Sequence, residues 1–317
     1  MGQDYHIPVL AQQAIEALKL KADGIYVDAT LGGGGYSEII LEQLGVLGGP
    51  NSTSLYGFDT DPQAIEYASK RLEKFGEKFT IIAENFSELQ NSLGERGVQK
   101  INGIVYDLGV SSRQLDTTSV GLSYRFDAPL DMRLDPRLVR SAMHIIAEST
   151  ADELRNIFGT YGEEPMSGRI ARWILEAREL KPIRSTHELA QIVTQGIRED
   201  KRNATLSRIF QALRIEVNDE LGSLRSSLKQ ALGIVCSGGR IVVVSYHSLE
   251  DRIVKDFFST NANPKVAEGS IESLRMSTDQ KMALLRLVTK KPTMPVEEEI
   301  LANSRARSAK LRVAEVK

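Results

Sequence analysis

Short β-branched runs alternate with amphipathic stretches in the first third of the chain. The runs lie at residues 24–28, 54–59, 79–83 and 103–107, and the stretches between them have the apolar spacing of helices. One of these stretches, over 62–75, opens with a proline, which suits the first turn of a helix. Strands that alternate with helices in this way predict an α/β fold built on a parallel sheet.

The middle of the chain has a helical pattern instead. The next strand candidate, 240–246, comes more than 100 residues after the run at 103–107. Within that interval, Thr150 and Ser185 are each followed three residues later by a glutamate, which is the layout of a helix capping box. Sequential strands of an open α/β sheet are joined by far less chain than this. The interval therefore predicts a separate helical module.

The predicted core is discontinuous. It comprises residues 1–112 and 215–317, and the helical domain over 113–214 is inserted between them. Two further strand candidates, 285–288 and 310–316, close the chain and are predicted to add antiparallel strands at the sheet edge. A module inserted after a strand end often forms one wall of a ligand site in such folds.

Composition narrows the class of protein. No apolar run approaches the ~20 residues that span a bilayer, and the first residues lack the pattern of a secretory signal. The single cysteine, Cys236, fits a reducing compartment. One cysteine and four scattered histidines form no spacing typical of a metal site. These features predict a cytoplasmic protein with no membrane association and no bound metal.

The net charge of −2 argues against a protein that binds nucleic acid through a global positive field. Local basic residues are present, and an ordinary solvated surface explains each of them singly. Their clustering in two segments favours contacts with RNA phosphates. The candidates are Lys201, Arg202 and Arg208, with Arg305, Arg307 and Lys310 near the end of the chain.

The strongest local signal is a glycine-rich loop at 28–37, with the sequence Asp-Ala-Thr-Leu-Gly-Gly-Gly-Gly-Tyr-Ser. It lies between the first predicted strand and a helix predicted over 38–44. Glycines allow tight turns and close approach to a ligand, and the helix N-terminus offers N–H groups to a carboxylate or phosphate. A flexible loop is the alternative, but the position favours ligand binding. The spacing matches neither the dinucleotide nor the P-loop pattern.

Polar or aromatic residues follow the next three strands as well. Asp59 ends the second strand, where a carboxylate accepts hydrogen bonds from ribose hydroxyls, and Asp61 suits a helix cap before Pro62. Phe86 follows the third strand, as an adenine neighbour or as core packing, and Asp107 ends the fourth. Since parallel strands end at one edge, the pattern predicts a binding crevice for an adenosine cofactor.

The chain resembles the bacterial RsmH (MraW) family in motifs that run in order along its length. They lie at residues 6–10, 28–37, 59–62, 107–114, 127–133, 210–215, 246–252 and 305–308. The resemblance implies a class I, Rossmann-like S-adenosylmethionine methyltransferase core with an inserted helical domain. It also implies N4-methylation of a cytidine in the decoding region of 16S rRNA, within the small ribosomal subunit. S-adenosylhomocysteine is then the product.

The same resemblance implies which residues contact the cofactor. They are Gly34, Gly35, Tyr36, Asp59, Phe86, Asp107 and Gln114. Tyr36 stands where the family usually has histidine, a change without effect on a contact made by the backbone N–H. The segment 201–209 also departs from the family pattern, so its RNA contacts are not implied by the resemblance.

Asp107 and His247 are the candidate catalytic residues. Methyl transfer from a sulfonium is an in-line displacement, in which alignment supplies most of the acceleration. The Asp107 carboxylate, with the Leu108 carbonyl, is placed to accept the N–H groups of a cytosine amine, and no strong base is needed. His247 follows the fifth strand of the core, either as a substrate-side positioner or proton acceptor or as part of a helix cap, for which Ser248 is also suited.

Other assignments stay open. In the charged loop 127–137, Asp131 and Arg133 either clamp the target nucleotide or form a salt-bridged hinge between the modules. The acceptor could be a protein or small molecule, which the net negative charge slightly favours. A non-catalytic cofactor-binding protein of ribosome assembly is disfavoured by the retained Asp107 and the complete glycine loop. A monomer and a homodimer are both compatible with the sequence.

Overall fold

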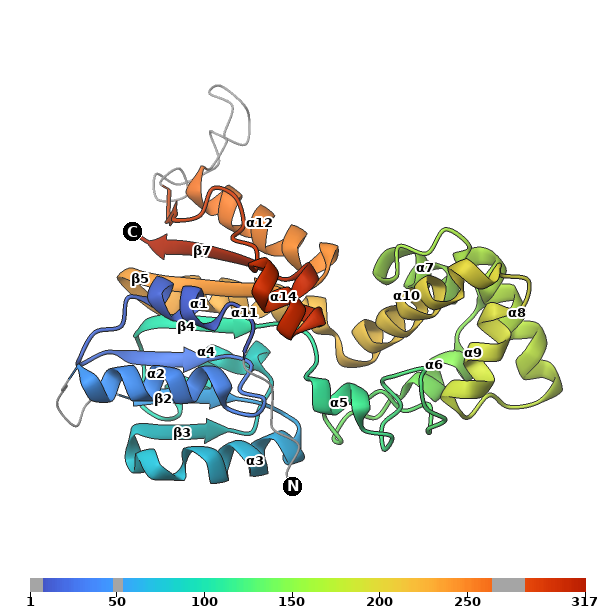
Figure 1. The fold of residues 1–317 in the computed structure, drawn as a ribbon, viewed down its shortest axis with the longest axis horizontal. Coiled ribbons are helices and arrows are strands. Elements are labelled where there is room, and N and C mark those ends of the chain that lie inside the picture. The colour runs from blue at the N-terminus through green and yellow to red at the C-terminus, as the bar shows by residue number, and fades with distance from the viewer. Residues whose placement is uncertain (1–7, 48–53, 264–282) are drawn as a thin grey trace. The chain divides into compact units, whose positions relative to one another are not determined.

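The computed structural model describes residues 8–47, 54–263 and 283–317, so His6 and Ile7 of the motif at 6–10 lie outside the described residues. The chain forms two compact units (Figure 1). Unit 1 comprises Met1–Gly109 and Leu221–Lys317, and unit 2 comprises Val110–Glu220. The boundary predicted at 214/215 falls inside a continuous helix, which the structure keeps whole within unit 2.

Unit 1 contains a seven-stranded sheet in the order β3-β2-β1-β4-β5-β7-β6. The strands are β1 (Ile25–Asp28), β2 (Ser54–Phe58), β3 (Phe79–Ile82), β4 (Ile101–Asp107), β5 (Val235–Ser245), β6 (Leu285–Leu287) and β7 (Lys310–Val316). The first five are parallel, and β7 pairs antiparallel with both β5 and β6. The predicted parallel sheet and the two antiparallel strands at its edge are therefore confirmed.

Helices accompany these strands in unit 1. The α-helices are α1 (Ala11–Leu18), α2 (Gly35–Val46), α3 (Pro62–Leu72), α4 (Leu89–Gly94), α11 (Glu220–Ile234), α12 (Ser248–Ala262) and α14 (Glu297–Ala302). The 3-10 turns are η1 (Glu73–Lys78), η2 (Phe86–Glu88) and η4 (Ser304–Ser308). The helix predicted over 62–75 ends earlier, at Leu72, and the 3-10 turn that follows it contains Gly76 at a φ of 56°.

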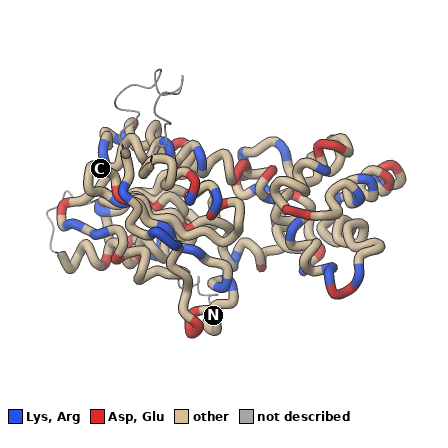
Figure 2. The backbone as a smooth tube through the Cα atoms, turned by 90° about the horizontal axis from the view of Figure 1, so that it is seen from above, with Lys and Arg blue, Asp and Glu red and all other residues tan. Residues whose placement is uncertain are grey.

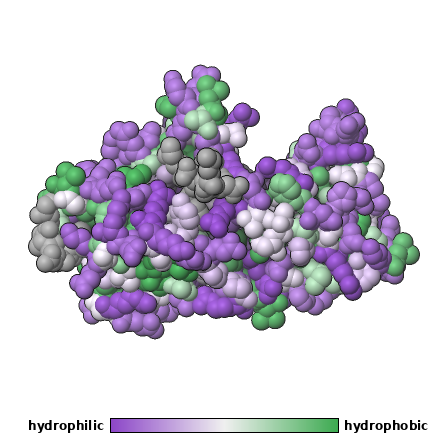
Figure 3. Space-filling view, turned by 60° about the horizontal axis from the view of Figure 1, so that its bottom comes forward, coloured by the Kyte–Doolittle hydropathy of each residue, from purple (hydrophilic) through white to green (hydrophobic). Residues whose placement is uncertain are grey.

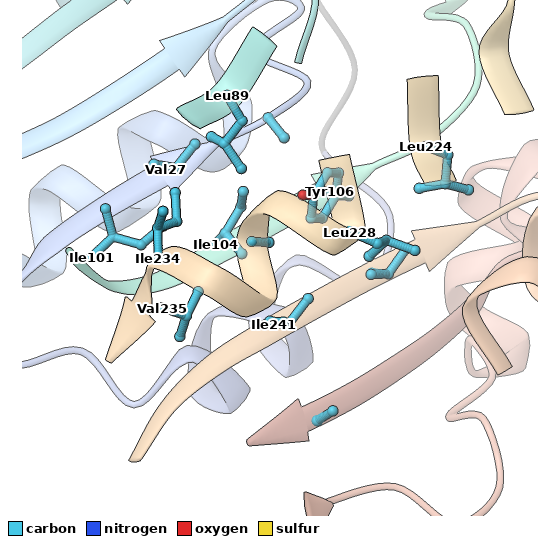
Figure 4. Close-up of a cluster of buried hydrophobic side chains, with 14 of the residues drawn as sticks. Val27, Leu89, Ile101, Ile104, Tyr106, Leu224, Leu228, Ile234, Val235 and Ile241 are labelled. Carbon is cyan, nitrogen blue, oxygen red and sulfur yellow. The ribbon is translucent and has the colours of Figure 1, made fainter. Parts of the chain in front are cut away.

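The sheet is buried on both faces, because its strands send alternate side chains to two hydrophobic clusters. In β4, Ile104 and Tyr106 point into one cluster and Val105 into the other. The first cluster includes Leu89 of α4 and Leu228 of α11 (Figure 4). Residues 103–106 of β4 and 239–245 of β5 are buried without a break, which explains the apolar runs in these strands.

Unit 2 is helical. It contains α5 (Ser112–Asp116), α6 (Ala142–Glu148), α7 (Ala151–Tyr161), α8 (Ser167–Leu180), α9 (Thr186–Thr194) and α10 (Glu199–Asn218). The two predicted capping boxes are confirmed, at the starts of α7 and α9. Its own core includes Phe158, Ile170, Ile174 and Leu213. None of the helices in the described part of the chain is both long and apolar enough to cross a bilayer.

Candidate active site

The carboxyl ends of four adjacent parallel strands meet at one edge of the sheet in unit 1 (Figure 1). Asp28 ends β1, Asp59 follows β2, Asn85 follows β3 and Asp107 ends β4. The expectation that these polar strand ends share an edge is confirmed. Ligands of open α/β sheets bind outside this edge, so these residues are candidates for ligand contacts.

The glycine loop passes from β1 into α2 by two residues in the left-handed region. Gly32 has a φ of 50° and Gly34 a φ of 76°. Gly34 is the N-cap residue of α2 and supplies no side chain to cap it. A Cβ atom at Gly34 would lie 3.0 Å from Cδ1 of Leu72. The loop therefore requires glycine there. The Gly34 N–H already donates to the Leu31 carbonyl at 2.8 Å, whereas the backbone N–H groups of Gly35 and Tyr36 stand at the start of the helix, where anions are stabilised.

Asp59 ties the end of β2 to the glycine loop. Its Oδ2 accepts a hydrogen bond from Gly32 N at 2.8 Å, and its Oδ1 accepts one from Asp61 N at 2.9 Å. The backbone of Thr60 also donates to this carboxylate, whose two oxygens together have about four acceptor sites, so it can still accept from a ligand hydroxyl. Burial raises the pKa of Asp59 to about 6. Asp61 caps α3 as predicted, with Oδ1 accepting from Gln63 N at 2.9 Å.

Asp28 is a buried carboxyl group beneath the same loop. Ser37 Oγ donates to its Oδ2 at 2.8 Å, and Thr30 N donates to its Oδ1 at 3.2 Å. Burial raises the pKa of Asp28 to about 6. Asp28 belongs to the glycine-rich motif at 28–37, but no role was predicted for it. Its position as the last residue of a buried strand was the available signal.

Asp107 lies at the end of β4 and is half-buried. Its backbone N donates to Thr30 Oγ1 at 2.6 Å, and its Oδ1 accepts a hydrogen bond from the Tyr246 hydroxyl at 2.7 Å. Burial raises the pKa of Asp107 to about 7; the Tyr246 hydrogen bond lowers it, and the negative charges of Asp28 and Glu250 add to the rise. Asp107 is therefore a carboxyl group that changes charge near neutral pH.

The two aromatic candidates for the cofactor site have different environments. The Tyr36 side chain is buried in the core and its hydroxyl donates to the Val9 carbonyl, so its backbone N–H remains as the group at the start of α2. Phe86 is half-buried and packs edge-on against Tyr106, with ring centroids 5.9 Å apart. Core packing thus accounts for one side of the Phe86 ring.

His247 forms the N-cap of α12, the position to which Ser248 was thought suited. Its Nδ1 accepts from Glu250 N at 3.4 Å, and Glu250 Oε2 accepts from Tyr246 N at 2.9 Å. His247 Nε2 lies 3.1 Å from Glu250 Oε1. The observed contacts of His247 are therefore those of a helix cap. A role for His247 in substrate positioning stays a prediction.

Gln114, Asp131 and Arg133 belong to unit 2 and make structural contacts there. Gln114 Oε1 accepts from Ser111 N at 2.9 Å, which completes a capping box at the start of α5. Arg133 binds Asp131 through one edge of its guanidinium group, with Nε to Oδ1 at 2.6 Å and Nη2 to Oδ2 at 2.8 Å. The loop thus contains a salt bridge, as one of the two alternatives supposed, and both of its residues lie within unit 2.

The basic candidates of unit 2 divide into paired and exposed residues. Arg208 Nε binds the buried Glu164 Oε2 at 2.7 Å and so supports the fold. Lys201 and Arg202 are exposed on α10, which includes the whole segment 201–209. Figure 2 shows basic and acidic residues interspersed in both units, and hydrophilic residues cover most of the face in Figure 3. In unit 1, Lys310 binds Asp251 at 3.0 Å.

A sheet of order 3-2-1-4-5-7-6 with an antiparallel seventh strand, a glycine loop after its first strand and acidic residues along its carboxyl edge define a class I, Rossmann-like methyltransferase fold. The model of the MraW methylase family matches residues 3–317. The chain belongs to the MraW methylase family.

Three similar proteins illustrate the likeness. Ribosomal RNA small subunit methyltransferase H of Carboxydothermus hydrogenoformans is 45% identical over 314 residues, which are 98% of this chain and 97% of the relative. A solved putative rRNA-methylase from Clostridium thermocellum has 12% identity, covers 98% of both chains and gives a TM-score of 0.44. A solved rRNA methylase from Streptococcus thermophilus has 13% identity, covers 96% of this chain and 93% of its own, and gives a TM-score of 0.39.

Proposed function

We propose that this protein uses S-adenosylmethionine to methylate N4 of a cytidine in the decoding region of 16S rRNA, within the small ribosomal subunit and in the cytoplasm. Membership of the MraW methylase family and the printed name of the Carboxydothermus relative support an rRNA acceptor. The observation that carries the chemistry is Asp107, a half-buried carboxyl group fixed by Tyr246 at the end of the central strand β4.

The residues at the sheet edge fit S-adenosylmethionine. The backbone N–H groups of Gly35 and Tyr36 suit its carboxylate, and Asp59 suits its ribose hydroxyls. Gly34 is proposed as a backbone contact that has no side chain to obstruct the cofactor. Phe86 is proposed as the adenine neighbour. Asp107 and Gln114 are proposed as further contacts. When bound, the sulfonium supplies the methyl group for an in-line displacement.

Asp107 is proposed to orient the acceptor. The lone pair of a cytosine amine is delocalised into the ring, and a carboxylate that accepts an N–H bond increases the electron density on the nitrogen. Asp107 offers Oδ2 for this purpose, since Oδ1 already accepts from Tyr246. The methylated nitrogen is cationic and acidic, so its proton leaves without a strong base. A pKa of about 7 allows Asp107 Oδ2 to take that proton.

Further contacts with the RNA substrate are proposed for residues of unit 2. Lys201 and Arg202 are exposed and suit phosphate oxygens. Arg208, Asp131 and Arg133 are already engaged in ion pairs, so their proposed role is to hold the surface on which RNA binds. His247 is proposed as a substrate-side positioner next to Tyr246.

The test is methyl transfer from labelled S-adenosylmethionine to 30S subunits from a strain that lacks the modification, followed by nucleoside mass spectrometry. We expect N4-methylcytidine in 16S rRNA, and a loss of about 100-fold or more in Asp107→Ala. Asp23→Ala is the matched control, because Asp23 is exposed at the opposite, amino end of β1. Cofactor binding without methylation of any nucleoside would refute the rRNA assignment, and protein acceptors would be tested next.

A further inference from the structure

We infer that Tyr246 is a positioning residue for the reaction: its hydroxyl holds one oxygen of Asp107, so that the other oxygen faces the amine of the acceptor. This inference rests on the proposed function, in which Asp107 accepts an N–H bond from a cytosine amine. Tyr246 itself is not expected to touch the substrate or the cofactor. It acts through the carboxyl group of Asp107.

The position of Tyr246 follows from the pairing of the two central strands. β4 and β5 are parallel neighbours, with Asp107 opposite Val244, and Leu108 N donates to the Val244 carbonyl at 2.9 Å. Tyr246 lies two residues beyond Val244, just past the end of β5. Its ring lies beside Gly109, where an added Cβ atom would be 3.6 Å from Tyr246 Cδ2. An added Cβ would therefore only touch the ring, and it is the φ of 91° at Gly109 that favours glycine there.

The backbone of Tyr246 is fixed as well as its hydroxyl. Tyr246 N donates to Glu250 Oε2 at 2.9 Å, and Glu250 is a buried residue in the first turn of α12. The hydroxyl at the other end of the side chain donates to Asp107 Oδ1 at 2.7 Å. A side chain held at both ends can fix the rotamer of the carboxyl group that it contacts.

The hydrogen bond has a defined direction. Burial raises the pKa of Tyr246 far above its ordinary range, so the phenol stays neutral and donates. The charged or titratable groups that face Asp107 are Asp28 from β1, Tyr36 from α2 and Glu250 from α12. These groups are acidic. Within the described residues, Lys and Arg side chains make no ion pair with Asp107, so the Tyr246 hydroxyl is the donor that favours the carboxylate form.

The contacts of Asp107 also indicate a role for its second carboxylate oxygen, Oδ2. Among the residues that the structure describes, none donates a hydrogen bond to Asp107 Oδ2, whereas Oδ1 is occupied by Tyr246 and the backbone N by Thr30 Oγ1. An acceptor oxygen with no protein partner among the described residues, on a carboxyl group whose other oxygen and whose backbone are both held, is suited to an incoming N–H donor. Removal of the Tyr246 hydroxyl would release the carboxyl rotamer and raise the pKa of Asp107.

The test compares Tyr246→Phe with Tyr106→Phe. The Tyr106 hydroxyl also makes one hydrogen bond, to Ser227 Oγ at 2.8 Å, but it is buried and points into the core cluster. Each variant therefore loses one hydrogen-bonded phenol hydroxyl. The pH profile of methyl transfer to 30S subunits is measured for the full-length protein. The carboxyl carbon of Asp107 is followed by NMR titration in protein labelled at aspartate, with Asp107→Asn to assign the resonance.

We expect the acid limb of the rate profile and the Asp107 titration to move up together by about one pH unit in Tyr246→Phe. The rate would then fall about tenfold near pH 6 and recover in alkaline solution. Tyr106→Phe is expected to leave both curves in place. Unchanged curves in Tyr246→Phe, or equal shifts in the two variants, would overturn the inference.

The two readouts separate this inference from the proposed function. A shifted Asp107 titration with an unshifted rate profile would overturn the role of Tyr246 and leave the methylation of rRNA standing. A wild-type protein that methylates no nucleoside would refute the proposed function. The proposed role of Tyr246 toward a cytosine amine would then be refuted as well. The NMR titration would still show whether the Tyr246 hydroxyl lowers the pKa of the Asp107 carboxyl group.

Discussion

Three carboxyl groups lie at the edge of the sheet where the ligand is proposed to bind. Asp28, Asp59 and Asp107 each have a pKa raised by burial, and negative neighbours raise the values further. The hydrogen bonds that lower them come from backbone N–H groups and from hydroxyls. This arrangement favours a ligand that brings positive charge to the edge, as a sulfonium with an ammonium group does.

The raised pKa of Asp28 predicts a pH-dependent stability. The unfolded chain releases this proton near pH 4, whereas the folded protein holds it to about pH 6. The stability contributed by the neutral form is therefore present below about pH 4 and is lost as the pH rises to about 6. Asp28→Asn removes the titration, so the variant should lose less stability between about pH 4 and pH 7, by about 3 kcal/mol at most.

The measurement is the free energy of unfolding by urea at several pH values, without cofactor. Asp23→Asn serves as the control, since it removes the same charge from an exposed turn. If Asp28→Asn and wild type showed the same dependence on pH, burial of this carboxyl group would not be the cause.

At the scale of single elements, α2 depends on the glycine that starts it. Gly34 has a φ of 76°, and an added Cβ would lie 3.0 Å from Leu72. Left-handed backbone costs an alanine about 1–2 kcal/mol, and the contact with Leu72 adds to this. Gly34→Ala should therefore lower the free energy of unfolding by about 2 kcal/mol and weaken cofactor binding.

A second glycine in the same helix provides the control. Gly45 is exposed, has helical backbone and has nothing within 4 Å of an added Cβ. Gly45→Ala should raise the free energy of unfolding by up to about 1 kcal/mol, because alanine favours the helix. Equal stability of the two variants in urea unfolding would contradict the requirement for glycine at the start of α2.

The elements differ in how far local sequence determines them. The ends of β1 to β4 and the caps of α7 and α9 depend on nearby residues, and the sequence predicted them. The start of β5 was predicted too late, at 240, whereas its pairing with β4 begins at Val235. A cap role for His247 was one of the two alternatives, but propensity suited Ser248 to the same position. The contact between Tyr246 and Asp107 joins residues 139 positions apart, which no local pattern encodes.

At the scale of the whole molecule, the proposed roles divide between the two units. The glycine loop and the three carboxyl groups belong to unit 1, and the exposed basic pair Lys201 and Arg202 belongs to unit 2. The division predicts that substitutions in α10 alter RNA binding without altering cofactor binding. Binding of S-adenosylhomocysteine and binding of 30S subunits can be measured separately to test this.

The double variant Lys201→Gln, Arg202→Gln makes that prediction specific. Each lost phosphate contact should lower the salt dependence of 30S binding by about 0.7–0.9 in the slope of log K against log salt. The dissociation constant for S-adenosylhomocysteine should stay the same. Lys290→Gln, Lys291→Gln is the matched control, because it removes an adjacent pair of exposed charges from unit 1. An equal loss of slope in both double variants would mean that the net charge of the protein, and not a surface on α10, governs RNA binding.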